Sequence, residues 1–211
     1  MKGPQTEAEL EEFLSRPTDA DAAHAAALTG DVLVLGAGGK MGPSLARLAK
    51  RSGARVIAVA RFTDHELPAR LAADGIRTIA SDMLAPGALA KLPDAPNVIF
   101  MAARKFGTAG NEHLTWAMNT FLPGLVAERY RDSKIVAFST GNVYPLVAVD
   151  SGGATEATAP APVGEYAQSA LGRERMFEYG AAQWGTKAAI LRLNYAVEMR
   201  YGVLADIGRA V

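Results

Sequence analysis

Short apolar runs alternate with longer amphipathic stretches along most of this chain. Six apolar runs of five to seven residues, rich in Val, Ile, Leu and Ala, are separated by segments whose apolar residues recur at helical spacing. Continuous apolar runs are typical of strands buried on both faces, as in a parallel sheet, and the intervening segments predict crossover helices. The pattern therefore predicts an α/β fold, a Rossmann-type doubly wound parallel sheet with helices on both faces.

The pattern also gives approximate bounds for each element. Strands are expected at 31–35, 55–60, 76–80, 97–102, 134–139 and 187–193. Helices are expected at 41–51, 64–74, 85–92, 111–130 (interrupted near Pro123) and 165–184, with a further helical stretch over 201–210. A loop rich in Gly, Pro and Thr spans 146–163.

The first 29 residues do not share this alternation. Thr6 followed by Glu9 has capping-box spacing and predicts a short acidic helix over 7–15, and the alanine-rich stretch 21–28 predicts a second helix. This segment is expected to be a strap across the domain or a contact with a partner subunit; a disordered tail is the alternative. We divide the chain into an N-terminal helical arm, residues 1–29, and a Rossmann domain, residues 30–211.

Composition narrows the classes of function. The 211 residues suit one domain with a substantial core, and the formal net charge of zero favours neither nucleic acid nor an anionic membrane as a partner. The chain has no cysteine, and His24, His65 and His113 lack metal-ligand spacing, so no metal site is expected. No apolar run approaches the about 20 residues of a membrane span, and a cytoplasmic location is the default expectation.

The turn between the first strand and the first helix is the most informative stretch. Its sequence is Gly36-Ala37-Gly38-Gly39-Lys40-Met41-Gly42. A helix N-terminus offers unpaired N–H groups and the positive end of a dipole, and glycine lets a phosphate approach the backbone. We therefore predict the pyrophosphate cradle of a dinucleotide site, with Gly36, Gly39, Lys40, Met41 and Gly42 as cofactor-binding residues. A βα turn without a ligand is the alternative.

Further motifs follow the glycine loop in order. They are Ser81-Asp82-Met83-Leu84, Phe100-Met101-Ala102-Ala103, Asn119, Phe138-Ser139-Thr140-Gly141-Asn142-Val143-Tyr144, Tyr166 and Leu191-Arg192-Leu193-Asn194. Together with the loop they resemble the extended short-chain dehydrogenase/reductase superfamily, which contains the NAD-dependent epimerases and dehydratases of nucleotide sugars. The resemblance implies an NAD(P)-binding oxidoreductase or epimerase whose partner is a small-molecule substrate, either a carbonyl compound or a sugar such as a nucleotide sugar.

The resemblance also assigns cofactor contacts beyond the loop. Asp82 would accept a hydrogen bond from the adenine amine, beside the Met83 backbone N–H, although an aspartate here also suits a strand-end cap. Ala102 and Ala103 would lie along the cofactor.

The end of the second strand bears on the choice of nucleotide. Relatives that use NAD carry a carboxylate there, which binds the ribose hydroxyls, whereas this chain has Ala60 followed by Arg61. An arginine suits the 2′-phosphate of NADP, so we expect NADP, with NAD as the alternative. A solvated Arg61 without a ligand would leave this choice open.

The chemistry implied by the resemblance is hydride transfer at the nicotinamide, coupled to proton transfer by a tyrosine. Tyr166 and Thr140 match the catalytic tyrosine and the Ser/Thr that polarises the substrate oxygen. The lysine that relatives carry four residues after the tyrosine is replaced by Ala170. A phenol without a neighbouring cation is a poor general base at neutral pH. Arg173 and Lys105 are candidate substitutes, although a helix arginine is usually solvated.

A second departure concerns the C-terminal part. Relatives usually continue for about 100 residues after the sixth strand and build their sugar-binding lobe there, so we expect a substrate lobe that is short or missing, or a fragment. Three interpretations stay open: an enzyme with modified catalytic roles, a catalytically degenerate dinucleotide-binding protein that acts as a sensor or supports a partner, and a structural subunit. The alanine-rich faces of the two long helices suit a homodimer as well as packing on the sheet.

Overall fold

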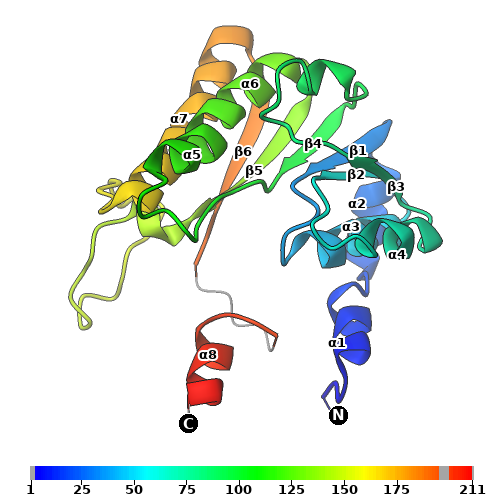
Figure 1. Cartoon of the computed structure of the whole chain (residues 1–211), viewed down its shortest axis with the longest axis horizontal. Coiled ribbons are helices and arrows are strands. Elements are labelled where there is room, and N and C mark those ends of the chain that lie inside the picture. Colours follow the sequence, from blue (N-terminus) through cyan, green and yellow to red (C-terminus); the bar gives the residue numbers. More distant parts are fainter. Residues whose placement is uncertain (1–2, 195–199, 211) are drawn as a thin grey trace.

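A six-stranded parallel sheet forms the centre of the computed structural model, which describes residues 3–194 and 200–210 (Figure 1). The strands are β1 (Asp31–Leu35), β2 (Arg55–Ala60), β3 (Arg77–Ala80), β4 (Asn97–Phe100), β5 (Lys134–Thr140) and β6 (Lys187–Leu193). Their order is β3-β2-β1-β4-β5-β6, and every neighbouring pair is parallel. The predicted Rossmann fold is confirmed, and the strand order reverses between β1 and β4, where such sheets bind ligands.

Helices cover both faces of the sheet, and successive side chains along a strand pack alternately against one set of helices and the other. The helical elements are α1 (Glu7–Leu14), α2 (Asp19–Ala26), α3 (Gly42–Arg51), α4 (Leu67–Ala73), η1 (Leu89–Lys91), α5 (Glu112–Trp116), η2 (Ala117–Phe121), α6 (Leu122–Arg129), η3 (Gly141–Val143), α7 (Glu165–Trp184) and α8 (Val203–Ala210). Leu33 packs with Leu122 and Phe177 of α6 and α7, whereas its neighbour Val34 packs with Leu71 of α4. Figure 1 shows α5, α6 and α7 grouped over β4–β6 and α3 and α4 beside β1–β3.

Two predicted helices are shorter in the structure. The helix expected at 85–92 is only the 3₁₀ turn η1, because Gly87 takes a φ of 72° that an α-helix does not contain. The helix expected from Asp64 begins at Leu67 instead. The Asp64 carboxylate accepts a hydrogen bond from the Glu66 N–H at 3.0 Å, which holds the preceding residues in a turn.

The predicted interruption of the long helix takes the form of a π-helix. Between α5 and α6, residues 117–121 form the π-helical element η2, directly before Pro123. Proline lacks an N–H, and its ring clashes with the carbonyl four residues earlier, so the α-helical ladder cannot continue through Asn119. The wider turn buries the Asn119 side chain completely.

The N-terminal arm contributes no strand and packs against α3. Only half of the predicted capping box forms: the Glu9 N–H donates to Thr6 Oγ1 at 3.1 Å, but the Glu9 carboxylate accepts from the Gln5 N–H. On the same helix, Glu11 binds Arg47 of α3 at 3.0 Å and Arg200 at 2.8 Å. The arm is thereby fixed to the domain and to the segment before α8, and the division at residue 29 stays a prediction.

Within 3–194 and 200–210, no helix has the length and apolar character needed to cross a membrane. The same residues contain no cluster of three or more His, Asp or Glu side chains arranged for a metal ion.

Candidate cofactor site and active site

Two glycines of the loop after β1 are required by close backbone approach. Gly36 has a φ of 99°, and a Cβ built on it would lie 2.5 Å from the Ala102 backbone nitrogen. A Cβ on Gly42 would lie 2.4 Å from the Ala37 carbonyl oxygen. Both distances are shorter than any real contact, so these glycines set the loop against the end of β4 and the start of α3.

Gly39 differs from its two neighbours in the motif. A Cβ there would meet only the Gly36 carbonyl oxygen, at an ordinary 3.5 Å. The fold therefore does not need glycine at this position, whereas a ligand that approaches the backbone does. The first turn of α3 contains Pro43, and the Met41 side chain makes no capping hydrogen bond. No side chain caps this helix end, but the Gly42 N–H donates to the Gly39 carbonyl at 3.3 Å and Pro43 has no N–H. The loop therefore fits a phosphate mainly through the positive end of the helix dipole and the open approach at Gly39.

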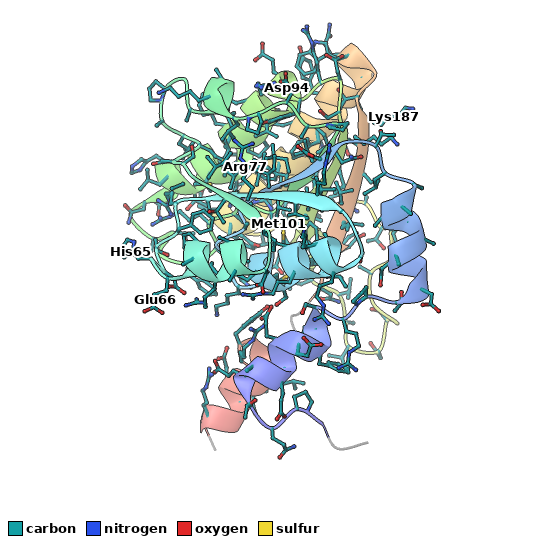
Figure 2. The ribbon with its side chains drawn as sticks, turned by 90° about the vertical axis from the view of Figure 1, so that its right-hand side faces the viewer. His65, Glu66, Arg77, Asp94, Met101 and Lys187 are labelled. Carbon is teal, nitrogen blue, oxygen red and sulfur yellow. The ribbon has the colours of Figure 1, made fainter. Side chains whose placement is uncertain are left out.

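A pocket of about 200 Å³ adjoins the loop. Predicted residues that line it are Gly36, Gly39, Arg61, Asp82, Met83, Ala102 and Ala103. Figure 2 shows Met101, another lining residue, near the centre of the molecule, whereas His65 and Glu66 lie at its edge. The predicted Lys40, Met41 and Gly42 do not line the pocket. Gly42 is buried under the loop, and Lys40 Nζ lies 4.8 Å from the ring centroid of Tyr201.

Sequence reasoning missed some lining residues. Phe62 and Thr63 follow Arg61, and Met118 comes from the π-helix. Phe62 is buried with a φ of 50°, a backbone conformation that is rare for a bulky residue. Phe62 and Thr63 could have been predicted as lining residues, because they come directly after a strand of the parallel sheet. Met118 reaches the pocket through tertiary packing, which no local pattern shows.

Asp82 and Arg61 both line the pocket but differ in their hydrogen bonding to the protein. Asp82 Oδ1 accepts a hydrogen bond from the Leu84 N–H at 3.1 Å, so the aspartate acts as the local cap that was the alternative to a ligand contact. Its second carboxylate oxygen is available. The Arg61 side chain is exposed and has no hydrogen bond or ion pair to any described residue.

The predicted catalytic pair lies beyond this pocket, at the same edge of the sheet. Thr140 ends β5, and its Oγ1 accepts a hydrogen bond from the Asn142 N–H at 3.2 Å. Tyr166 stands in the first turn of α7, which packs against β5 and η3. Lys105 Nζ lies 5.9 Å from the centroid of the Tyr166 ring. Neither predicted catalytic residue lines the pocket of the glycine loop.

Arg173 is buried, which differs from the expectation that a helix arginine is solvated. Ala170, at the position of the missing lysine, is 0% exposed, and Arg173 is 3% exposed. Arg173 Nη1 donates to the Phe138 carbonyl at 2.7 Å, and Nη2 donates to Asn119 Oδ1 at 3.0 Å. Burial lowers the pKa of Arg173 to about 10, which leaves the guanidinium protonated at neutral pH.

Asn119 connects the Arg173 guanidinium to the loop after β4 and to the first turn of α7. Its Oδ1 accepts from the Arg104 N–H at 2.8 Å, and its Nδ2 donates to the Arg104 carbonyl at 2.9 Å and to Ser169 Oγ at 3.0 Å. Ser169 Oγ in turn donates to the Tyr166 carbonyl at 2.9 Å. Asn119 therefore ties the segment after Ala103 to the start of α7.

A second buried network lies behind Thr140. Ser139 Oγ donates to Glu174 Oε1 at 2.5 Å, and Arg192 of β6 holds both oxygens of the same carboxylate, with a shortest distance of 2.7 Å. Arg192 also donates to the Tyr144 hydroxyl at 3.0 Å. Hydrogen bonds to Glu174 hold the pKa of Arg192 above its ordinary value. This network joins β5, β6 and α7, and sequence reasoning did not identify it.

The amino-acid sequence that forms this site matches a protein-family model. The model of the NAD dependent epimerase/dehydratase family matches residues 32–197, from β1 past the end of β6. The chain belongs to this family. No curated protein sequence matches it.

Solved nucleotide-sugar epimerases share the fold of this chain. The UDP-glucuronic acid 4-epimerase from Bacillus cereus, in complex with NAD, is 22% identical, with a TM-score of 0.69 over 78% of this chain and 56% of that one. The UDP-Glc/GlcNAc 4-epimerase from Campylobacter jejuni is 19% identical, with a TM-score of 0.70 over 78% of this chain and 53% of that one. This family member therefore spans about half the length of the epimerases it resembles.

Proposed function

We propose that this chain binds NADP in preference to NAD and belongs to an oxidoreductase or epimerase that acts on a sugar or carbonyl substrate, such as a nucleotide sugar. The observation that carries the proposal is the absence of a side chain at Gly39, where the fold does not require glycine. Gly39 lines a pocket that the unpartnered Arg61 also lines. Membership of the NAD dependent epimerase/dehydratase family supports the cofactor class.

Four features carry the proposed roles. The N-terminal end of α3 holds the pyrophosphate, and the planar Arg61 guanidinium pairs with the 2′-phosphate. The bound cofactor supplies hydride chemistry at its nicotinamide. Thr140 Oγ1 donates to the substrate oxygen, and the Tyr166 hydroxyl exchanges a proton with it.

The substrate class and the assembly are extensions of the same proposal. The Thermotoga maritima UDP-glucose 4-epimerase, solved with UDP-glucose, shares the fold at a TM-score of 0.67 and 19% identity, over 77% of this chain and 54% of that one. A nucleotide sugar is the substrate class we propose on that basis. The exposed Leu114, Trp116 and Phe121 on α5 and η2 support a homodimer through the long helices. A cytoplasmic location stays a prediction.

A second candidate function is a dinucleotide-binding protein without turnover. The buried Ala170 in place of lysine favours it, because the family's usual cation is absent from that position. A vestigial loop in a purely structural subunit is disfavoured by Gly39, whose missing side chain serves no packing need.

A binding titration tests the proposal. NADPH and NADH fluorescence is followed while the purified chain is added, and we expect NADPH to bind at least about tenfold more tightly, since a charge-assisted bidentate pair is gained. Equal affinities would contradict the NADP preference, and no binding of either nucleotide would overturn the whole proposal. Incubation of the bound form with UDP-sugars, with products separated by chromatography, then distinguishes the enzyme from the non-catalytic protein.

A further inference from the structure

Arg173 is a buried cation without a carboxylate partner. Its Nη1 and Nη2 bond to two neutral oxygens, the Phe138 carbonyl and the Asn119 side-chain amide. The adjacent Glu174 is committed to Arg192 and Ser139. In the part of the chain that the structure describes, no acidic side chain forms an ion pair with Arg173, and its buried Nε–H has no hydrogen-bond partner.

Such an arrangement is costly for the fold. Desolvating a charge without an opposite charge is unfavourable, and well-packed apolar residues often replace buried ions without loss of stability. Two neutral acceptors and the Phe100 ring, whose centroid lies 5.7 Å from the guanidinium carbon, offset part of this cost, and the orphaned Nε–H adds to it. Stability therefore does not explain why an arginine stands here.

The position of Arg173 gives a functional reason. Tyr166, Ala170 and Arg173 are spaced four and three residues apart on α7, so they share one face of the helix. Ala170 places no long side chain between them. Arg173 donates to Phe138, two residues before Thr140, and through Asn119 it reaches the backbone that follows Ala103. Burial lowers the pKa of Arg173, and the charges of Tyr166 and of the adjacent Glu174 partly oppose that shift, so Arg173 interacts electrostatically with Tyr166.

We propose that Arg173 is a positioning residue that supplies the fixed positive charge of this active site, one helical turn beyond the position where relatives carry a lysine. This inference rests on the proposed function. The buried guanidinium favours negative charge developing on the Tyr166 oxygen, and it favours the reduced nicotinamide over the cationic oxidised one.

Lys105 is the competing source of charge, and it is less suited. It lies beside the Tyr166 ring, but its side chain is exposed on the loop after β4. Water and salt screen an exposed ammonium strongly, whereas a buried guanidinium held by two hydrogen bonds keeps its field and its position.

A binding experiment distinguishes an electrostatic role of Arg173 from a purely structural one, and it does not require catalytic turnover. Dissociation constants for NADP⁺ and NADPH are measured by calorimetry for the wild-type chain, Arg173→Gln, Arg173→Lys, Lys105→Gln and Arg175→Gln. The ratio of the two constants reports the local charge, because the nicotinamide rings differ by one unit of charge. Arg175 is the matched control, since it lies on α7 with its side chain 51% exposed.

We expect Arg173→Gln to change the ratio by about tenfold in favour of NADP⁺, the order of magnitude expected when one nearby unit charge is removed at an effective dielectric constant of about 20. Arg173→Lys is expected to keep the wild-type ratio within about twofold because it keeps the charge, and Arg175→Gln should behave as wild type. Circular dichroism and thermal melting establish that each variant is folded. If Arg173→Gln does not fold, Arg173→Met, which retains bulk, replaces it in the comparison with Arg173→Lys.

Three outcomes would overturn the inference. Equal weakening of both nucleotides in Arg173→Gln would assign the residue a structural role only. A larger change of the ratio in Lys105→Gln would assign the charge to the loop instead. If the wild-type chain bound neither nucleotide, the proposed function would fail as well, whereas in the first two cases it would stand.

Discussion

The two halves of the sheet organise their polar groups in opposite ways. In the half formed by β1–β3, Gly39 and Arg61 face the pocket with little protein around them. In the half formed by β4–β6 and α7, Asn119, Arg173 and Glu174 are buried and bonded to one another or to backbone. In the first half, the site is formed by backbone and by side chains that have few protein partners. In the second half, hydrogen-bonded side chains connect the elements to one another.

The difference predicts how each half responds to change. When a residue has no protein partner, as Arg61 does, its substitution should lower ligand affinity without loss of stability, because no other protein group is left unsatisfied. A buried network loses stability, because each removed group leaves partners unsatisfied in a low-dielectric interior. Substitutions of Gly39 and Arg61 should therefore mainly affect binding, and substitutions of Glu174 should mainly affect folding; Arg173 is the exception, because we expect its charge to act on the bound nucleotide as well.

The largest expected effect is on the stability of the β4–β6 half. Glu174→Ala leaves Arg192 and Ser139 without their partner, and we expect a loss of about 3 kcal/mol in the free energy of unfolding. Denaturant titration followed by circular dichroism measures it. Glu178→Ala on the same helix removes an exposed pair with Arg175 and should cost less than about 1 kcal/mol. Similar losses in the two variants would contradict the distinction.

Two glycine substitutions test the comparison within the first half. Gly36→Ala is expected to destabilise the fold by about 2–3 kcal/mol, because the new Cβ would collide with the Ala102 backbone at a positive φ. Gly39→Ala should change stability by less than about 0.5 kcal/mol and yet weaken NADPH binding about tenfold or more. Thermal melts and nucleotide titrations of both variants provide the measurement. Destabilisation by Gly39→Ala would show that this glycine serves the fold.

Arg61→Ala gives a smaller and purely functional effect. We expect NADPH to bind about tenfold or more weakly and NADH to change less than about twofold, since only NADPH carries the 2′-phosphate. Fluorescence titration of both nucleotides measures this, with unchanged thermal melting as the control. An equal loss for the two nucleotides would exclude Arg61 as the phosphate-binding group.

The smallest expected effect concerns the arm. Burial works against the ionised Glu11 carboxylate, but hydrogen bonds from Arg200 and Arg47 outweigh it and hold the pKa of Glu11 below its ordinary value. A lowered pKa means that the stabilisation is present at neutral pH and is lost as pH falls through the folded pKa, below the ordinary pKa of a glutamate. Protection against hydrogen exchange over Glu7–Leu14, expressed relative to the intrinsic exchange rate at each pH, should fall there, and Glu11→Gln should show the lower protection already at pH 7. An arm that is equally protected at both pH values would contradict this.

Much of the fold follows from local pattern. All six strands lie where apolar runs predict them, with small differences at the ends. The reason is clearest for β1, β2 and β4, which are buried along most of their length and therefore need a continuous apolar sequence. The failures are also local in origin: the Pro86-Gly87 pair prevented the helix expected at 85–92, and the turn at Asp64 delayed α4. Turn chemistry overrode helical periodicity in both cases.

The sequence by itself determined the βα alternation, the glycine loop and the absence of lysine at position 170, since each depends on neighbouring residues or fixed spacing. Only the tertiary structure decided that Met118 reaches the pocket, that Glu174 joins Ser139 to Arg192, and that Arg173 is buried. Those contacts join residues that are far apart in the chain, and whether an arginine is solvated or buried depends on what packs over it. Its charge was visible in the sequence, but its desolvation was not.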